Sequence, residues 1–179
     1  MELYRIYRFK DMVRIPPERF GEDLKKVALE LLREEYEGVI DEELGIILTV
    51  TDVDISPEGY IVPGDGGTYH EATFTLLAFK PLRNEVVEGI VVNVTKNGIY
   101  VNIGPIDGMV HKAQLGDERF EYDAATGSMV GTSTKTVIKR GDLVRARIVQ
   151  ISTRRGLKVG MSMKGPYLGK IKDAEEVKQ

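Results

Sequence analysis

The chain has 179 residues, 25 Lys and Arg, 28 Asp and Glu, and a formal net charge of −3 at pH 7. It contains no Cys, which excludes disulfides and thiolate metal sites, and no apolar run approaches the roughly 20 residues of a membrane-spanning helix. Because the N-terminus is charged and unlike a signal peptide, we expect a soluble cytoplasmic protein with no membrane partner.

The charge is divided unequally along the chain. Residues 1–80 hold 9 basic and 17 acidic residues, a net charge of −8, whereas residues 81–179 hold 16 and 11, a net charge of +5. Residues 135–172 hold 11 basic residues and one acidic residue, Asp142. The division predicts one domain for protein contacts and one for nucleic acid. The alternative is an ordinary solvated charged surface.

The N-terminal half, residues 1–80, predicts a small sheet with one helix. Residues 2–9 favour a strand. Further along, Pro16 and Pro17 stop any extended pairing. Apolar residues then recur every three or four positions from Leu24 to Tyr36, which indicates one helix about four turns long. Gly38 is placed to cap its C-terminus.

Two further strands complete this half. Residues 45–56 read as a long strand in which the apolar positions change parity, so we expect a β-bulge near Thr51 and Asp52. Residues 57–67 are crowded with Gly and Pro and predict a loop. Residues 69–79 read as the return strand, and Lys80–Pro81 as a hinge. The order is β-α-β-β, and the fold class is α+β to mainly β.

The C-terminal half, residues 82–179, predicts five short strands at about 85–95, 99–103, 108–111, 142–151 and 157–163. Asn97–Gly98 and Asp107–Gly108 mark tight turns between them. Residues 116–140 form a long polar insert, and a loop of this length tends to be functional or mobile. Residues 173–179 are expected to fray.

The segment VEGIVVNVTKNGIYVNIGPIDGMVHKAQL at residues 87–115, followed by GDLVRARIVQI at 141–151, has the strand and glycine order of a known family. It resembles the S1-like RNA-binding domain, a five-stranded OB-fold barrel. Such barrels hold single-stranded nucleic acid on one strand face and its loops. The resemblance therefore implies an RNA-binding barrel at 82–179.

Two N-terminal motifs extend the likeness to nearly the whole chain. They are VRIPPERFGEDL at residues 13–24 and VPGDGGTYHEATFTLLAFKP at 62–81. With the barrel and its insert behind them, the chain resembles the archaeal RNA polymerase stalk subunits called E-prime or subunit seven. These are counterparts of the eukaryotic polymerase II stalk subunit.

The resemblance implies a non-catalytic, nucleoid-associated subunit of DNA-directed RNA polymerase that aids open-complex formation and processivity. Its RNP-like tip domain would dock on the polymerase core near the clamp, and a small helical stalk protein, designated F, would complete a heterodimer. The S1-like domain would bind nascent single-stranded RNA. The core-docking residues expected in the two N-terminal turns are Pro16, Pro17, Phe20, Gly64, Asp65 and Gly66.

Tyr100 and His111 match S1-like positions that meet bases, and a base stacked on an aromatic ring contributes roughly 1–3 kcal/mol. Asn97 stands where many members of the family have a second aromatic residue, so we expect weak, sequence-tolerant binding. The alternatives are barrel packing for Tyr100, with its hydroxyl in water, and a histidine satisfied by its own turn for His111.

A second RNA-binding group is basic. Arg145 and Arg147 are two apart, so they share one strand face while Val144, Ala146 and Ile148 fill the other. Single-stranded RNA held by Z phosphate contacts shows a log–log salt slope of about −0.7Z, so changing both arginines to Ala should flatten it. The residues that could extend this face are Lys112, Arg154, Arg155 and Lys158.

Enzyme signatures are incomplete in this sequence. The glycine-rich stretch 63–67 lacks the Gly-Lys-Ser/Thr of a phosphate loop, and His70–Glu71 lacks the second histidine of a zinc-protease helix. Asp52 and Asp54 share a strand face, but we expect no basic or metal-binding partner beside them, which favours surface charge. We therefore expect no cofactor, no metal and no catalytic site.

Two other functions remain as alternatives. An S1-like accessory subunit of an RNA-degrading complex should carry a barrel or zinc module in its N-terminal half, which this sequence lacks. A translation factor usually places its S1-like domain first, whereas here it comes second.

Overall fold

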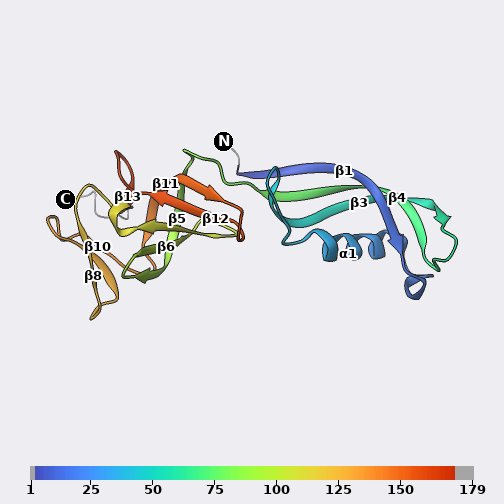
Figure 1. Ribbon diagram of the computed structural model, residues 1–179, viewed down its shortest axis with the longest axis horizontal. Coiled ribbons are helices and arrows are strands. Elements are labelled where there is room, and N and C mark those ends of the chain that lie inside the picture. The colour runs from blue at the N-terminus through green and yellow to red at the C-terminus, as the bar shows by residue number, and fades with distance from the viewer. Residues whose placement is uncertain (1–2, 172–179) are drawn as a thin grey trace, which may run out of the picture. The chain divides into compact units, whose positions relative to one another are not determined.

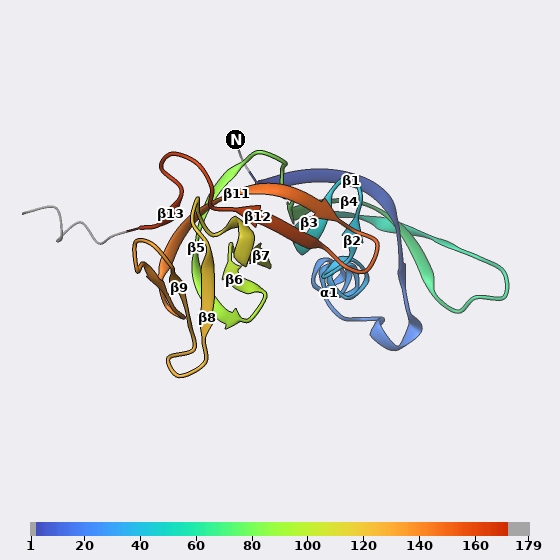
Figure 2. The same ribbon diagram turned by 60° about the vertical axis from the view of Figure 1, so that its left-hand side comes forward.

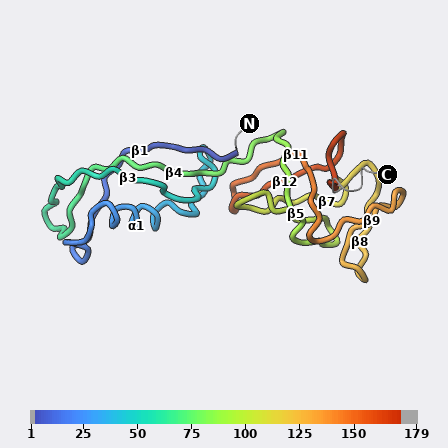
Figure 3. The backbone as a smooth tube through the Cα atoms, turned by 180° about the vertical axis from the view of Figure 1, so that it is seen from behind, coloured from blue at the N-terminus to red at the C-terminus, as the bar shows by residue number. Residues whose placement is uncertain are grey.

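The computed structural model describes residues 3–171, and the chain divides into two compact units after Lys80. Both units are built mainly from antiparallel strands, and Figure 3 traces their backbone along the chain. An α+β unit followed by a β-barrel confirms the predicted fold class.

The N-terminal unit is a four-stranded antiparallel sheet with one helix on one face (Figure 1). Its sheet order is β1-β4-β3-β2. Val27, Ala28 and Leu32 of the helix are buried in one core with Val50 and Phe74 of the sheet. The elements are β1 (Tyr4–Ile15), a 3-10 turn η1 (Pro17–Arg19), α1 (Leu24–Tyr36), β2 (Ile40–Asp41), β3 (Gly45–Ile61) and β4 (Thr68–Phe79).

Helix α1 confirms the predicted bounds, and its ends have local causes. The Asp23 carboxylate accepts a hydrogen bond from the Lys26 amide at 2.7 Å, which caps the N-terminus. The helix ends at Tyr36, and Gly38 follows with a φ of +81°, a conformation that glycine adopts at little cost.

Strand β1 is longer than predicted. Instead of ending at residue 9, it continues to Ile15 and pairs along its whole length with β4. The charged pair Lys10–Asp11 interrupts the apolar pattern in the sequence, but Val13 and Ile15 beyond it return to the core. The strand therefore stops only at Pro16, where the chain turns into η1.

Strand β3 confirms the expected bulge and corrects the expected loop. Its register with β4 shifts between Val50 and Asp52, which lets Val50 and Val53 share the buried face. Residues 57–61, predicted as loop, belong to the strand. Pro57 is tolerated because it falls in another register shift, between Ile55 and Gly59, where no ladder donor is required.

The C-terminal unit is a closed five-stranded barrel whose order is β12-β7-β6-β5-β11, with β11 pairing back to β12. A short strand, β13, pairs with β11 on the edge opposite β5, the edge that also pairs with β12. All five predicted strands are present within about two residues. Their bounds are β5 (Val86–Thr95), β6 (Gly98–Asn102), β7 (Asp107–His111), β11 (Leu143–Ser152) and β12 (Lys158–Ser162), and β13 covers Gly169–Lys170.

The insert at 116–140, which the sequence marked only as a long polar loop that tends to be functional or mobile, is folded. It forms a three-stranded sheet of β8 (Phe120–Asp123), β9 (Ser128–Gly131) and β10 (Val137–Ile138), in the order β10-β9-β8. Phe120, Met129 and Ile138 are buried. These three apolar residues are far apart in the sequence, so no local apolar periodicity predicts that they are buried. The predicted fraying of 173–179 lies outside the described residues.

Candidate docking and RNA-binding surfaces

Both predicted docking segments lie at the same end of the N-terminal sheet. Ile15, at the end of β1, pairs with Thr68, at the start of β4, so the turn after β1 and the turn before β4 are neighbours. A Cβ placed on Gly66 would lie 3.2 Å from Cγ of Pro17. The structure thus brings together Pro16, Pro17, Phe20, Gly64, Asp65 and Gly66, and we call this end the tip surface.

Asp65 ties the tip surface to the sheet. Its carboxylate accepts two hydrogen bonds from the Arg14 guanidinium, at 2.8 and 2.5 Å, one from the Tyr69 hydroxyl at 2.6 Å and one from the Gly67 amide at 2.9 Å. The hydrogen bonds from Arg14 are the main reason that the pKa of Asp65 lies far below its ordinary value. Asp65 therefore fixes the turn that carries this part of the tip surface.

The neighbouring turn is fixed in a similar way. Arg19 of η1 donates to Glu22 at 2.6 and 2.9 Å and to Glu30 of α1 at 2.6 Å. These bonds raise the pKa of Arg19, and the bond from Arg19 lowers the pKa of Glu22. Both turns of the tip surface are consequently held by charge-assisted hydrogen bonds within the unit.

The tip surface also exposes large apolar side chains. Ile61 is 77% exposed and Phe20 is 50% exposed, and Tyr60 and Val62 are exposed beside them. Ile61 and Phe20 border a cavity of about 350 Å³ that reaches Val27 of α1. Exposed apolar groups gathered around a cavity are typical of a protein–protein contact.

His70 is a structural residue of this end that the sequence did not reveal. It is buried, with Nδ1 at 2.8 Å from the Ser56 carbonyl and Nε2 at 2.9 Å from the Thr68 hydroxyl. Its ring fills the space beside Gly59, where an added Cβ would lie 2.6 Å from it. In the sequence, His70 stood out only as part of the His70–Glu71 pair. That pair lacks the second histidine of a zinc-protease motif, and nothing in the sequence pointed to a structural role for His70.

On the barrel, one row of outward residues crosses four neighbouring strands. Register aligns Tyr100 of β6 with Met109 of β7, Met109 with Gly160 of β12, and Gly160 with Gln150 of β11. Tyr100 is 37% exposed, and the residues on either side of it, Ile99 and Val101, are buried in the barrel. Its ring therefore lies on the outer surface of the barrel.

His111, Lys112 and Lys158 lie around this row. His111 follows Met109 by two positions on the same face of β7, and Lys158 precedes Gly160 by two on β12. The His111 ring accepts a hydrogen bond from the Ala113 amide at 3.2 Å, so the histidine does cap its own turn, a 3-10 turn η2 (Lys112–Gln114). All three side chains are exposed. With Tyr100 and Met109 they form what we call the β6–β7 surface.

Arg145 and Arg147 point outward from β11, because Val144, Ala146 and Ile148 are buried. Arg147 pairs with Ser162, at the opposite end of β12 from Lys158, so the two arginines are not in the Tyr100 row. Arg145 already has partners: it donates to Glu88 at 2.8 and 2.6 Å and to the Tyr167 carbonyl at 3.2 Å. Arg154 and Arg155 are exposed in the turn between β11 and β12.

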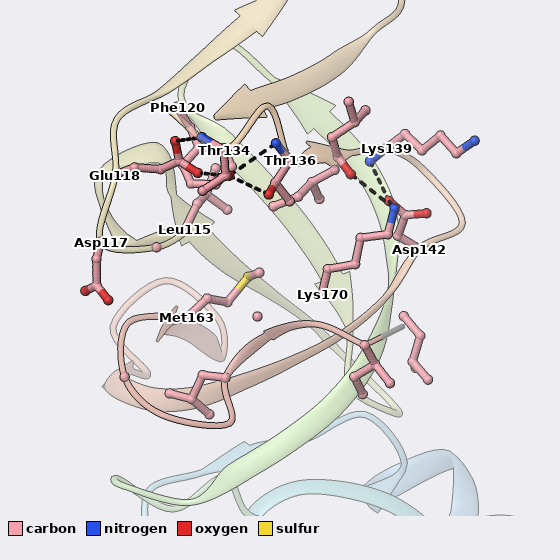
Figure 4. Close-up of a pocket in the computed structure, with 18 of the residues that line it drawn as sticks. Leu115, Asp117, Glu118, Phe120, Thr134, Thr136, Lys139, Asp142, Met163 and Lys170 are labelled. Atoms are coloured by element: carbon pink, nitrogen blue, oxygen red, sulfur yellow. Dashed lines mark hydrogen bonds and ion pairs between the residues drawn. The ribbon is translucent and has the colours of Figure 1, made fainter. Parts of the chain in front are cut away.

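A groove of about 1210 Å³ separates the insert sheet from the end of the barrel (Figure 4). Two of its carboxylates, Glu118 and Asp142, have partners among the residues that line the groove. Glu118 accepts hydrogen bonds from Thr134, which is the main cause of its lowered pKa, and from the Ser133 amide. Asp142 accepts from the Lys139 amide at 2.9 Å and pairs with Lys170 at 3.1 Å. Lys170 also donates to the Val137 carbonyl at 3.1 Å, and this bond joins β13 to the insert.

Asp52 has a partner that the sequence did not suggest. Lys25 of α1 lies 2.9 Å from its carboxylate, and this contact lowers the pKa of Asp52 and raises that of Lys25. Both side chains are well exposed, so the expected surface-charge interpretation of Asp52 still applies. Within residues 3–171, no group of three potential metal ligands is present. No helix in the same range is long and apolar enough to cross a membrane.

Both units match families of known domains. Residues 10–66 match the SHS2 domain found in the N terminus of Rpb7p/Rpc25p/MJ0397. Residues 80–162 match the S1 RNA binding domain. The two matches fall in the same order as the sheet unit and the barrel.

Relatives match along nearly the whole chain. The DNA-directed RNA polymerase subunit Rpo7 of Sulfolobus acidocaldarius is 41% identical over 94% of this chain and 93% of its own length. The Rpo7 of Saccharolobus solfataricus is 41% identical over 99% of this chain and 100% of its own length. The DNA-directed RNA polymerase II subunit rpb7 of Schizosaccharomyces pombe is 30% identical over 88% and 92%. The chain therefore belongs to the Rpo7 family of DNA-directed RNA polymerase subunits.

Proposed function

We propose that this protein is the larger, non-catalytic stalk subunit of a cytoplasmic, nucleoid-associated RNA polymerase. It docks on the core near the clamp through its tip surface, forms a heterodimer with the small helical stalk protein designated F, and binds nascent single-stranded RNA through its barrel. The observation that carries the proposal is the 41% identity with an Rpo7 subunit over 94% of the chain.

The composition of the tip surface supports core docking. Ile61, Phe20 and Val62 are exposed apolar side chains in or beside the turns that Arg14–Asp65 and Arg19–Glu30 hold in place. A surface held in its binding conformation loses little conformational entropy when a partner covers it. The cavity beneath Ile61 and Phe20 offers a place for an apolar side chain of the core.

The β6–β7 surface supports RNA binding. It places an exposed aromatic ring, Tyr100, among His111, Lys112 and Lys158. Rings that stack on bases and cations that follow the phosphate backbone are the two components of sequence-tolerant single-strand binding. The charge and stacking groups are few, so we expect weak affinity.

Docking can be tested by exchanging Ile61 and Phe20 for Ser in tagged protein expressed in its native cells. Both side chains are exposed, so the fold should tolerate the changes, and recovery of the large polymerase subunits should fall severalfold. Val39→Ser is the matched control, because Val39 is an exposed apolar residue beyond the other end of α1. Equal recovery of polymerase with both variants would show that the core docks elsewhere.

A further inference from the structure

Tyr167 adopts a conformation that its residue type normally avoids. The Leu168 amide donates to the Gly165 carbonyl at 3.4 Å across a turn with Pro166 second and Tyr167 third. Tyr167 has a φ of +64°, and a positive φ at this position of a turn ordinarily requires Gly or Asn. Tyr167 is 88% exposed, so burial of its side chain does not offset the free energy of the backbone strain. Strain kept at an exposed aromatic residue indicates a function for the ring.

The turn that carries Tyr167 is held firmly. Arg145 donates to the Tyr167 carbonyl at 3.2 Å, and Glu88 holds the same guanidinium through two bonds of 2.8 and 2.6 Å. Immediately after the turn, Gly169 and Lys170 pair with β11 as β13. In Figure 2 the dark red loop that precedes β13 stands out from the barrel. The ring is thus displayed on a fixed support, which lowers the entropy lost on binding.

The surroundings of Tyr167 carry positive charge. Ser162 pairs with Arg147 and Gly169 pairs with Arg145, so the loop between them runs alongside both arginines. Arg147 is exposed on β11, and Lys164 is exposed in the loop itself. An exposed ring beside exposed cations matches a base and its phosphates better than it matches an apolar protein surface.

We propose that Tyr167 is a second base-stacking platform for single-stranded RNA. It lies beside β11, whereas the β6–β7 surface lies on the other side of β12. Arg147 and Lys164 supply its phosphate contacts. Arg145 is a positioning residue, because its guanidinium is engaged by Glu88 and by the turn. The inference rests on the proposed RNA-binding function and adds a site that the S1-like resemblance did not assign.

The test measures binding of a fluorescein-labelled oligouridylate to the full-length protein by anisotropy. Tyr167→Ala should weaken binding by roughly five- to a hundredfold, the range of one lost base–aromatic stack. Tyr167→Phe keeps the ring and should bind as the wild type does. Tyr167→Gly removes both the ring and the strain, so it should bind as weakly as Tyr167→Ala while unfolding at no lower urea concentration than the wild type.

The salt dependence of the same binding separates the two arginines. Arg147→Ala should flatten the log–log salt slope by about 0.7, the value for one phosphate contact on a single strand. Arg145→Ala should weaken RNA binding and leave the salt slope unchanged. The double variant with Tyr167→Ala should bind RNA only slightly more weakly than Arg145→Ala alone. A flattened slope for Arg145→Ala would make it a phosphate contact and overturn its positioning role.

The outcomes distinguish the inference from the function on which it rests. If the wild type binds the RNA and Tyr167→Ala binds it equally well, the Tyr167 platform is excluded while RNA binding stands. If Tyr100→Ala and Tyr167→Ala both weaken binding, the barrel has two platforms, as proposed. If the wild type does not bind the RNA at all, the proposed RNA-binding function itself fails, and the platform fails with it.

Discussion

At the scale of single residues, several groups that a partner could use are already occupied by neighbours in the fold. Asp65 and Arg145 are both in predicted sites, yet each makes its strongest contacts inside the chain, with Arg14 and Glu88. The partners lie 51 and 57 residues away in the sequence. A single sequence shows that a carboxylate or a guanidinium is present, but not which distant group engages it.

Replacing Asp65 with Asn should destabilise the N-terminal unit at pH 7, because Arg14 and Tyr69 lose a charged acceptor. The folded-state pKa of Asp65 is lowered, so its contribution is complete above the ordinary value of 3.8. The contribution declines as the pH falls below that value and is lost as the pH falls through the lowered folded-state pKa. The gap in urea midpoint between wild type and variant should therefore be larger at pH 7 than at about pH 3.

Asp54→Asn is the matched control for this measurement, since Asp54 is an exposed carboxylate of β3 in the same unit. It should leave the urea midpoint nearly unchanged at both pH values. A pH-independent gap for Asp65→Asn would mean that the hydrogen-bond geometry, and not the charge of Asp65, stabilises the turn.

Tyr100 can be tested separately from the barrel's stability. Tyr100→Ala should weaken single-stranded RNA binding by roughly five- to a hundredfold, whereas Tyr100→Phe should retain it, because the stack needs the ring and not the hydroxyl. Anisotropy titrations give the affinities, and urea unfolding of the same samples reports folding. A stability loss in Tyr100→Ala without a change in affinity would favour the packing role over the RNA contact.

At the scale of elements, the sequence predicted the elements that depend on neighbouring residues. It did not predict those that depend on contacts between residues far apart in the chain. Helix α1 and the bulge in β3 follow from the spacing of neighbouring apolar residues and were confirmed. The insert sheet was missed because its core joins Phe120, Met129 and Ile138, which polar residues separate. Residues 57–61 were missed as strand because Pro and Gly ordinarily end strands, and a register shift accommodates Pro57 here.

The insert therefore gives a clear prediction for hydrogen exchange. Its ladder amides, such as that of Gly131, which bonds to the Thr136 carbonyl at 2.9 Å, should exchange slowly rather than at the rate of a mobile loop. Met129 is fully buried, so Met129→Ala should cost about 2–5 kcal/mol and should speed exchange within 116–140. Unprotected insert amides in the wild type would show that the sheet is not formed in solution.

At the scale of the whole molecule, the two units differ in charge and in the chemistry that they expose. The acidic N-terminal unit presents apolar side chains at the tip surface, and the basic C-terminal unit presents rings and cations on its barrel. Such a division suits a subunit that joins a protein machine through one unit and contacts its RNA product through the other. The family assignment and this division of chemistry support the same proposal independently.

The most direct test is affinity purification of the tagged protein from its native cells in moderate salt, with stoichiometric partners identified by mass spectrometry. We predict recovery of the large RNA polymerase subunits together with one small helical protein. Recovery of nuclease or ribosomal proteins without polymerase would contradict the account and would leave only an RNA-binding barrel of unassigned role.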